Sequence, residues 1–190
     1  MKRHRIFISI NLPENIKKRL VGHQSKWPEL PIKWTKKENL HITLIFLGHL
    51  SSDELVEICK ITKEVASRSQ SFFVNLNKIN YGPPRKMPPR MIWAIGEKSK
   101  EFTLLRDDLE KSIIGSEKVN FSSENRIFSP HITLGRIKTW EFKQIEPEDR
   151  PQFVGGISFG FDVNSIEVME SQLKRGGPEY TILESAELQG

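Results

Sequence analysis

A tetrapeptide that occurs twice is the feature that most constrains this chain. The residues His-Ile-Thr-Leu stand at 41–44 and again at 131–134, 90 positions apart (131 − 41) in a chain of 190. An internal duplication is therefore the first hypothesis. Ile, Thr and Leu favour strands, and alternation of polar with apolar residues has the two-residue period of a sheet with one wet face. We expect two equivalent strands.

The period of a strand decides which side chains of each copy share a face. The His and the Thr of a copy point to one side, while the Ile and the Leu point into a core. If the two copies pack about an approximate two-fold axis, their polar faces lie opposite each other across a groove. The sequence thus predicts one site that contains two imidazoles and two hydroxyls.

The segments that lead into the two copies are also alike. The order strand, helix, tetrapeptide covers 35 positions from Ile6 to His41 (41 − 6) and 39 from Ile92 to His131 (131 − 92). Strands mixed with helices and hairpins predict an α+β fold, in one domain over residues 1–190 or two small lobes that share a core. We expect strands near 5–12, 32–34, 40–47, 72–76, 79–81, 91–96, 165–173 and 180–183, helices near 13–24, 51–68 and 102–113, a proline-rich loop or connector between halves at 82–90, and a surface helix or loop at 141–151.

The composition favours a soluble, globular, cytoplasmic protein. Hydrophobic residues make up 37% of the chain, and no apolar run approaches the roughly 20 residues of a membrane-spanning helix. Cys59 is the only cysteine, so no intrachain disulfide can form and a reducing compartment fits. It lies on the apolar side of a predicted helix, where it would be a packing residue. The net charge of +5 points weakly to an acidic partner such as nucleic acid.

Two facing imidazoles are well suited to displacement at phosphorus. Histidine has an unperturbed pKa of roughly 6.5, so near neutral pH one ring accepts a proton from a nucleophile while another donates one to a leaving group. An in-line attack needs these tasks on opposite sides of one phosphorus atom. Thr43 and Thr133 would donate hydrogen bonds to the phosphate oxygens, and Arg136 is the nearest guanidinium. This chemistry needs no metal and no cofactor.

Two alternatives compete with this interpretation. A single histidine at the edge of a strand is more often structural than catalytic, but a structural role does not explain why the Thr is repeated as well. A metal site would need a third ligand, and neither copy carries Asp, Glu or Cys at ligand spacing.

The extended motifs resemble those of a known family, the two-histidine (2H) phosphoesterases, and within it the RNA 2′,3′-cyclic phosphodiesterases, also called 2′-5′ RNA ligases. The segments that carry the resemblance are Ile6 to Pro13, His41-x-Thr43-x-x-Phe46 and His131-x-Thr133-x-x-Arg136. The resemblance implies two pseudo-two-fold-related lobes, each with an antiparallel sheet and outer helices, around a central groove. It also implies that the protein hydrolyses RNA 2′,3′-cyclic phosphate ends to 2′-phosphomonoesters, or joins RNA ends through a 2′-5′ linkage. The alternative is a non-catalytic protein that binds RNA ends in the same groove. We also expect a monomer.

The resemblance also implies a role for each motif residue. His41 would be the general acid that protonates the departing O3′, and His131 the general base on the attacking water. Thr43 and Thr133 would hold phosphate oxygens. Arg136 would stabilise the transition state, and Phe46 would stack on the terminal base.

Strand alternation conflicts with two of these roles. In a regular strand Phe46 and Arg136 point away from the histidines, towards the core. Gly135 predicts a bulge that re-aims Arg136, but no glycine precedes Phe46, which could equally be a core aromatic. Basic residues at 85–90, and Lys33, Trp34, Lys36 and Lys37, are candidates for tracking an RNA backbone, although solvated surface charge is the usual role of such residues.

Overall fold

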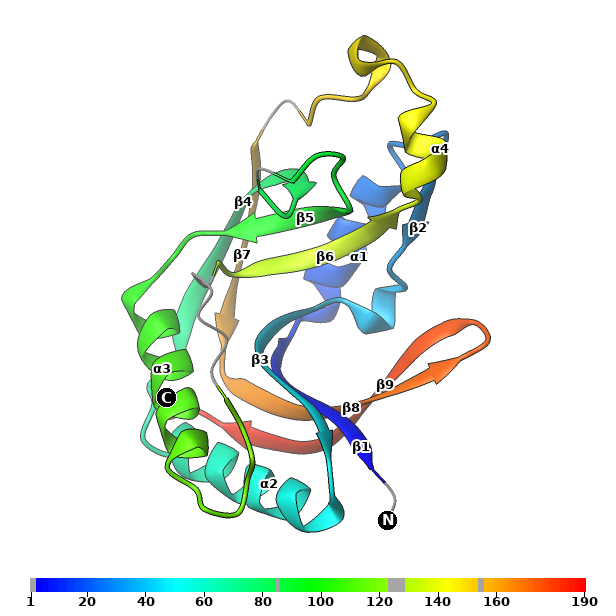
Figure 1. The fold of residues 1–190 in the computed structure, drawn as a ribbon. Coiled ribbons are helices and arrows are strands. Elements are labelled where there is room, and N and C mark those ends of the chain that lie inside the picture. The colour runs from blue at the N-terminus through cyan, green and yellow to red at the C-terminus, as the bar shows by residue number, and fades with distance from the viewer. Residues whose placement is uncertain (1–2, 85, 123–128, 154–155) are drawn as a thin grey trace.

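The computed structural model describes residues 3–84, 86–122, 129–153 and 156–190. Over these ranges nine strands form one curled antiparallel sheet in the order β7-β4-β5-β6-β3-β1-β8-β9, with β2 paired to β6 (Figure 1). The strands are β1 (His4–Asn11), β2 (Ile32–Trp34), β3 (His41–Leu50), β4 (Phe72–Gly82), β5 (Met91–Gly96), β6 (His131–Ile137), β7 (Gly156–Val163), β8 (Ser165–Lys174) and β9 (Gly177–Glu187). The helices are α1 (Glu14–Gln24), α2 (Ser52–Ala66), α3 (Lys100–Ile114), α4 (Thr139–Lys143) and the short 3-10 helices η1 (Lys37–Asn39) and η2 (Pro147–Asp149).

The two tetrapeptide strands, β3 and β6, meet at the centre of the sheet. Their paired residues are Ile42 and Ile132, both fully buried. On one side of this junction lies the series β3-β1-β8-β9, and on the other β6-β5-β4-β7. In each series the neighbour of the tetrapeptide strand is the strand that precedes a helix, β1 or β5. The predicted α+β fold with two pseudo-two-fold-related lobes is confirmed.

The lobes do not coincide with the halves of the chain. Strand β4, from the first half, pairs with β5, and strand β8, from the second half, pairs with β1. The loop at 82–90 therefore closes a hairpin within one lobe and does not connect the halves. Two predicted strands, 72–76 and 79–81, form the single strand β4 with a register shift between Leu76 and Lys78, and β7 was not predicted as a strand.

The helix α2 supports the sheet from its outer side. It begins with the predicted capping box, in which the Ser51 and Glu54 side chains each accept a hydrogen bond from the other residue's backbone N–H. Its inner face buries Ile58, Ile61 and Val65 against the core, and each such side chain contributes about 1.5–3 kcal/mol. Figure 1 shows α2 beside α3 at the lower edge of the molecule, below β1, β8 and β9.

Both tetrapeptide strands carry a β-bulge at the same motif position. Thr43 pairs with Ser9 and Ile45 pairs with Ile8, so Leu44 is an extra residue in β3. In β6 the same shift lies between Thr133 and Gly135, which pair with Trp93 and Ile92. A bulge shifts the alternation by one residue, so the side chains that follow turn to the other face.

The bulges resolve the conflict over Phe46 and Arg136. Phe46 is 47% exposed, so the alternative of a core aromatic is wrong, and Arg136 is exposed as well. The bulge at Gly135 is confirmed. In β3 the residue at the same motif position is Ile45, so a bulge there does not need a glycine. Gly135 is instead required by close packing. A Cβ there would lie 2.5 Å from Ile32 Cγ2 and 2.8 Å from Trp34 Cε3 of β2.

The packing of β2 on Gly135 predicts opposite effects for two Gly→Ala substitutions. Gly135→Ala should destabilise the protein by about 1–3 kcal/mol because the new methyl group overpacks against β2. Gly22→Ala, in α1, should stabilise it by up to about 1 kcal/mol, since nothing lies within 4 Å of a Cβ there. Urea unfolding of both variants measures the two changes, and a neutral or stabilising Gly135→Ala would contradict the packing.

Candidate active site

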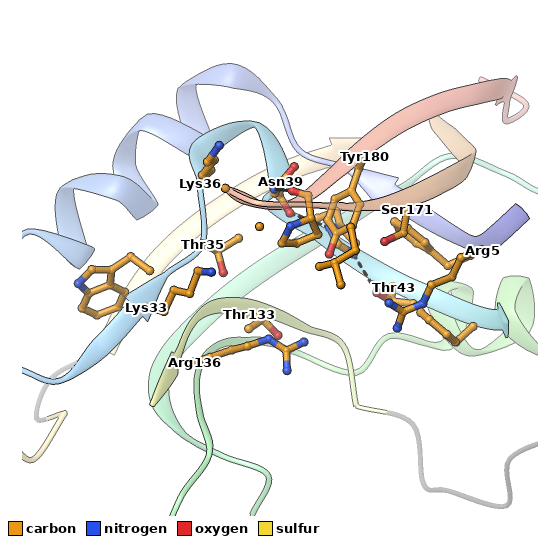
Figure 2. Close-up of a pocket in the computed structure, with 18 of the residues that line it drawn as sticks. Arg5, Lys33, Thr35, Lys36, Asn39, Thr43, Thr133, Arg136, Ser171 and Tyr180 are labelled. Carbon is orange, nitrogen blue, oxygen red and sulfur yellow. Dashed lines mark hydrogen bonds between the residues drawn. The ribbon is translucent and has the colours of Figure 1, made fainter. Parts of the chain in front are cut away.

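A pocket of about 650 Å³ lies where β3 and β6 meet, bounded by η1, the residues before it and the β8–β9 hairpin. Figure 2 shows Thr43, Thr133, Arg136 and Tyr180 around this pocket. All six predicted site residues line it: His41, Thr43, Phe46, His131, Thr133 and Arg136. The structure therefore brings together side chains from positions 90 apart in the sequence, as the repeated tetrapeptide predicted.

The two histidines are anchored in the same way. The Nδ1 atom of His41 lies 2.8 Å from the backbone oxygen of Asn39, and Nδ1 of His131 lies 2.8 Å from that of Ser129. A carbonyl oxygen only accepts, so each Nδ1 carries a proton and donates it. In each ring Nε2 is then the nitrogen that can exchange a proton with a ligand. The Nε2 atom of His41 lies 3.0 Å from the hydroxyl oxygen of Thr43.

Burial lowers the pKa of both histidines. The pKa of His41 falls to about 4, chiefly because the ring is desolvated, with smaller contributions from the charges of Lys17 and His131; the hydrogen bond to Asn39 opposes the shift. Burial also lowers the pKa of His131, against the hydrogen bond to Ser129. Both rings are thus neutral at pH 7 without a ligand. A bound anion would raise both pKa values.

Aromatic side chains that the sequence analysis did not single out fix the two rings. The ring of His131 stacks on Trp93 at 3.8 Å between centroids, and that of His41 is nearly perpendicular to the ring of Tyr180, with 5.2 Å between centroids. Trp93 in turn lies on Gly82, where a Cβ would come within 2.4 Å of the indole. Trp93 and Tyr180 come from strands β5 and β9, so only strand pairing could have revealed them.

The pocket is positively charged. Arg5, Lys33, Lys36 and Arg136 line it, and among the described residues no Asp or Glu does so. Lys37, also a candidate RNA contact, instead pairs with Glu14. The described residues of the basic loop at 82–90 do not line the pocket, and Arg85 lies outside the described residues. Such a lining suits an anionic ligand.

Three further features concern metal binding, membrane-spanning helices and Cys59. In the described parts of the chain, no group of three or more His, Cys, Asp or Glu side chains is arranged to hold a metal ion. None of the described helices combines the length and the apolar character needed to cross a membrane. Cys59 packs against the core, and burial raises the pKa of its thiol, which fits the predicted packing role.

Comparisons with known proteins show which family the chain resembles. Residues 10–93 match the family model described as LigT like Phosphoesterase. The chain is 30% identical over 180 residues to the RNA 2′,3′-cyclic phosphodiesterase of Methanocaldococcus jannaschii, which covers 94% of this chain and 98% of that protein. It is 32% identical over 162 residues to the protein of that name from Aeropyrum pernix, covering 81% and 85% of the two chains.

Solved structures share the fold. The crystal structure of the protein TT0787 of Thermus thermophilus superposes with a TM-score of 0.81 at 30% identity, covering 98% of both chains. The structure of Escherichia coli LigT complexed with 3′-AMP gives a TM-score of 0.75 at 25% identity over the whole of both chains.

The lowered histidine pKa values can be measured by NMR titration of the ring protons. We expect a midpoint near pH 4 for His41 and one below the usual 6.5 for His131. Inorganic phosphate should raise both, and His131→Ala should raise that of His41 by removing a neighbouring charge. Because the unfolded chain binds these protons more tightly, stability should also fall as the pH falls from 6.5 towards 4. An ordinary midpoint for His41 would contradict its burial.

Proposed function

The chain belongs to the LigT-like phosphoesterases, the family of RNA 2′,3′-cyclic phosphodiesterases, and we propose that it hydrolyses the cyclic phosphate at the end of an RNA strand to a 2′-phosphomonoester. One observation carries this proposal. Two histidines from equivalent strands, each with Nδ1 held by a backbone carbonyl, line a single positively charged pocket. That arrangement is what metal-independent acid–base catalysis at one phosphorus atom requires.

In the proposed reaction the two histidines exchange protons on opposite sides of the phosphorus. The neutral Nε2 of His131 takes a proton from water as the water oxygen bonds to phosphorus. The bond from phosphorus to O3′ breaks, and O3′ takes the proton from Nε2 of His41. The products are a 2′-phosphomonoester and a free 3′-hydroxyl. After the reaction His131 carries the proton and His41 does not, and proton exchange with solvent restores the starting state.

Three side chains would hold the phosphate during this step. The hydroxyls of Thr43 and Thr133 donate hydrogen bonds to the non-bridging oxygens, and the guanidinium of Arg136 balances the charge that builds on them. While the pocket is empty, the hydroxyl of Thr43 faces Nε2 of His41. When a bound phosphate raises the pKa of His41 and its Nε2 gains a proton, Nε2 and the Thr43 hydroxyl would both be donors to the phosphate.

Phe46 would bind the terminal base. Its ring is 47% exposed, stacks on Phe7 with 6.3 Å between centroids, and has the guanidinium of Arg5 at 5.1 Å. Stacking on an aromatic ring accepts every base, since each has a π-face, so we expect little sequence preference at this position. The single cysteine fits a reducing compartment, and we propose that the enzyme acts in the cytoplasm.

The assignment of acid and base predicts different rescue of two variants. His41→Ala and His131→Ala should each reduce kcat about 10²–10⁴-fold on an RNA 2′,3′-cyclic phosphate. When sulfur replaces O3′, the thiolate leaves without a proton, so His41→Ala should regain activity and His131→Ala should not. Circular dichroism controls for folding, and end-group analysis identifies the product. Full activity in both variants would refute the pair, and rescue of His131→Ala alone would reverse the roles.

The lowered pKa values also predict an acidic optimum for kcat/KM. Turnover needs one proton on the histidine pair, and kcat/KM reports the protonation of the free enzyme. Because both pKa values lie below 6.5, and that of His41 is about 4, the maximum should fall below pH 6.5. The apparent values belong to the coupled pair. The profile of kcat should be displaced to higher pH by the bound phosphate, whereas a kcat/KM maximum above pH 7 would contradict the mechanism.

A further inference from the structure

The permanent positive charges of the pocket lie in separate places. Figure 2 shows Lys33 and Lys36 on one side and Arg5 with Ser171 on the other, with Arg136 on the strand between. Arg136 serves the reacting phosphate in the proposed mechanism, and Arg5 lies over the ring of Phe46. Neither role uses the two lysines. Their charge is therefore unexplained by a ligand that carries a single phosphate.

The two lysine amines point to the turn of the β8–β9 hairpin. A Cβ at Gly177 would lie 3.7 Å from Nζ of Lys33, and one at Gly176 would lie 3.8 Å from Nζ of Lys36. Two consecutive glycines thus leave the space beside the amines open. Gly177 also has a φ of +116°, which other residues rarely adopt, so the turn itself favours glycine there.

One acid near these amines, Glu179, is already paired. The pKa of its carboxyl is lowered chiefly by Lys174, whose Nζ lies 2.7 Å away, and to a smaller extent by Lys36. Among the described residues, neither Lys33 nor Lys36 lies within ion-pair distance of a carboxylate. Lys33 instead stands directly opposite Arg136 in the pairing of β2 with β6. Two like charges side by side are unfavourable unless an anion joins them.

The shape of the substrate relates this cluster to Phe46. In a ribose 2′,3′-cyclic phosphate, the base leaves the ring at C1′, next to C2′, and the chain continues from C4′, next to C3′. The base and the 5′-phosphate therefore depart towards opposite ends of the edge that carries the cyclic phosphate. With the base on Phe46, the 5′-phosphate is directed to the other end of the pocket, where the lysines lie.

We propose that Lys33 and Lys36 form a second phosphate subsite, which binds the phosphodiester joining the terminal nucleotide to the one before it. This inference rests on the proposed function and narrows it. The substrate class becomes an RNA strand of at least two nucleotides, in preference to a mononucleoside cyclic phosphate. Lys37 has no part in the subsite because it pairs with Glu14.

The test compares two substrates in two variants. The substrates are a dinucleotide that ends in a 2′,3′-cyclic phosphate and the corresponding mononucleoside 2′,3′-cyclic phosphate. The wild-type protein should show the higher kcat/KM for the dinucleotide. In Lys33→Ala/Lys36→Ala the ratio of the two values should fall about tenfold, as expected for charged contacts at an exposed site. The dependence of log kcat/KM for the dinucleotide on log salt concentration should become shallower by about 0.7 for each phosphate that the lysines no longer neutralise.

A matched control removes the same charge elsewhere. Lys37→Ala/Lys86→Ala deletes two lysines outside the pocket lining and should keep the wild-type ratio. A dinucleotide with a neutral methylphosphonate linkage should lose its advantage with the wild-type protein. Equal kcat/KM for both substrates in the wild-type protein would overturn the subsite. So would a ratio that the two double variants change equally.

A binding measurement separates this inference from the proposed reaction. Calorimetry with a dinucleotide and a mononucleotide, each ending in a 2′-phosphate, reports the subsite without turnover. If cyclic phosphates are not hydrolysed but the dinucleotide still binds more tightly, and only Lys33→Ala/Lys36→Ala removes the difference, the subsite stands and the proposed reaction fails. If hydrolysis proceeds and both ligands bind equally, the reaction stands and the subsite is refuted.

Discussion

The pairing of β3 with β6 is the contact on which the rest of the structure depends. It joins the two series of strands through the buried pair Ile42 and Ile132, and each of the two strands carries one histidine on the face towards the pocket. Because each lobe contains strands from both halves of the chain, neither half can form a complete lobe alone. The position of one imidazole relative to the other is therefore set by the core of the whole protein and not by flexible loops.

Around that junction the duplication extends to backbone geometry. Both strands have the bulge directly after the threonine, and both histidines donate Nδ1–H to the carbonyl two positions earlier. The aromatic surroundings differ, since His131 stacks on Trp93 while the ring of His41 is nearly perpendicular to that of Tyr180. A symmetric scaffold with asymmetric neighbours is suited to a reaction in which one ring gives a proton and the other accepts one.

Electrostatics link the histidines to the ligand. Burial holds both rings neutral in the empty pocket, and the basic residues around them attract an anion whose charge then favours protonation. Binding of the anion and protonation of the histidines are therefore coupled through the electrostatic attraction between them. The described pocket wall carries no carboxylate, so a phosphate meets no competing anion there.

The sequence by itself determined the repeated strands, the α+β class and the two histidines and two threonines that share a face, because these follow from the period of residues close together in the chain. It could not decide between a stacking and a core role for Phe46, since a bulge without glycine leaves no local signal. Only the tertiary structure placed Lys33 and Lys36, but not Lys37, at the pocket, and brought Trp93 and Tyr180 to the histidines, because those contacts depend on the pairing of strands far apart in sequence. For Gly135 the sequence predicted the bulge, but only the structure showed why a glycine is needed there, which is the close approach of β2.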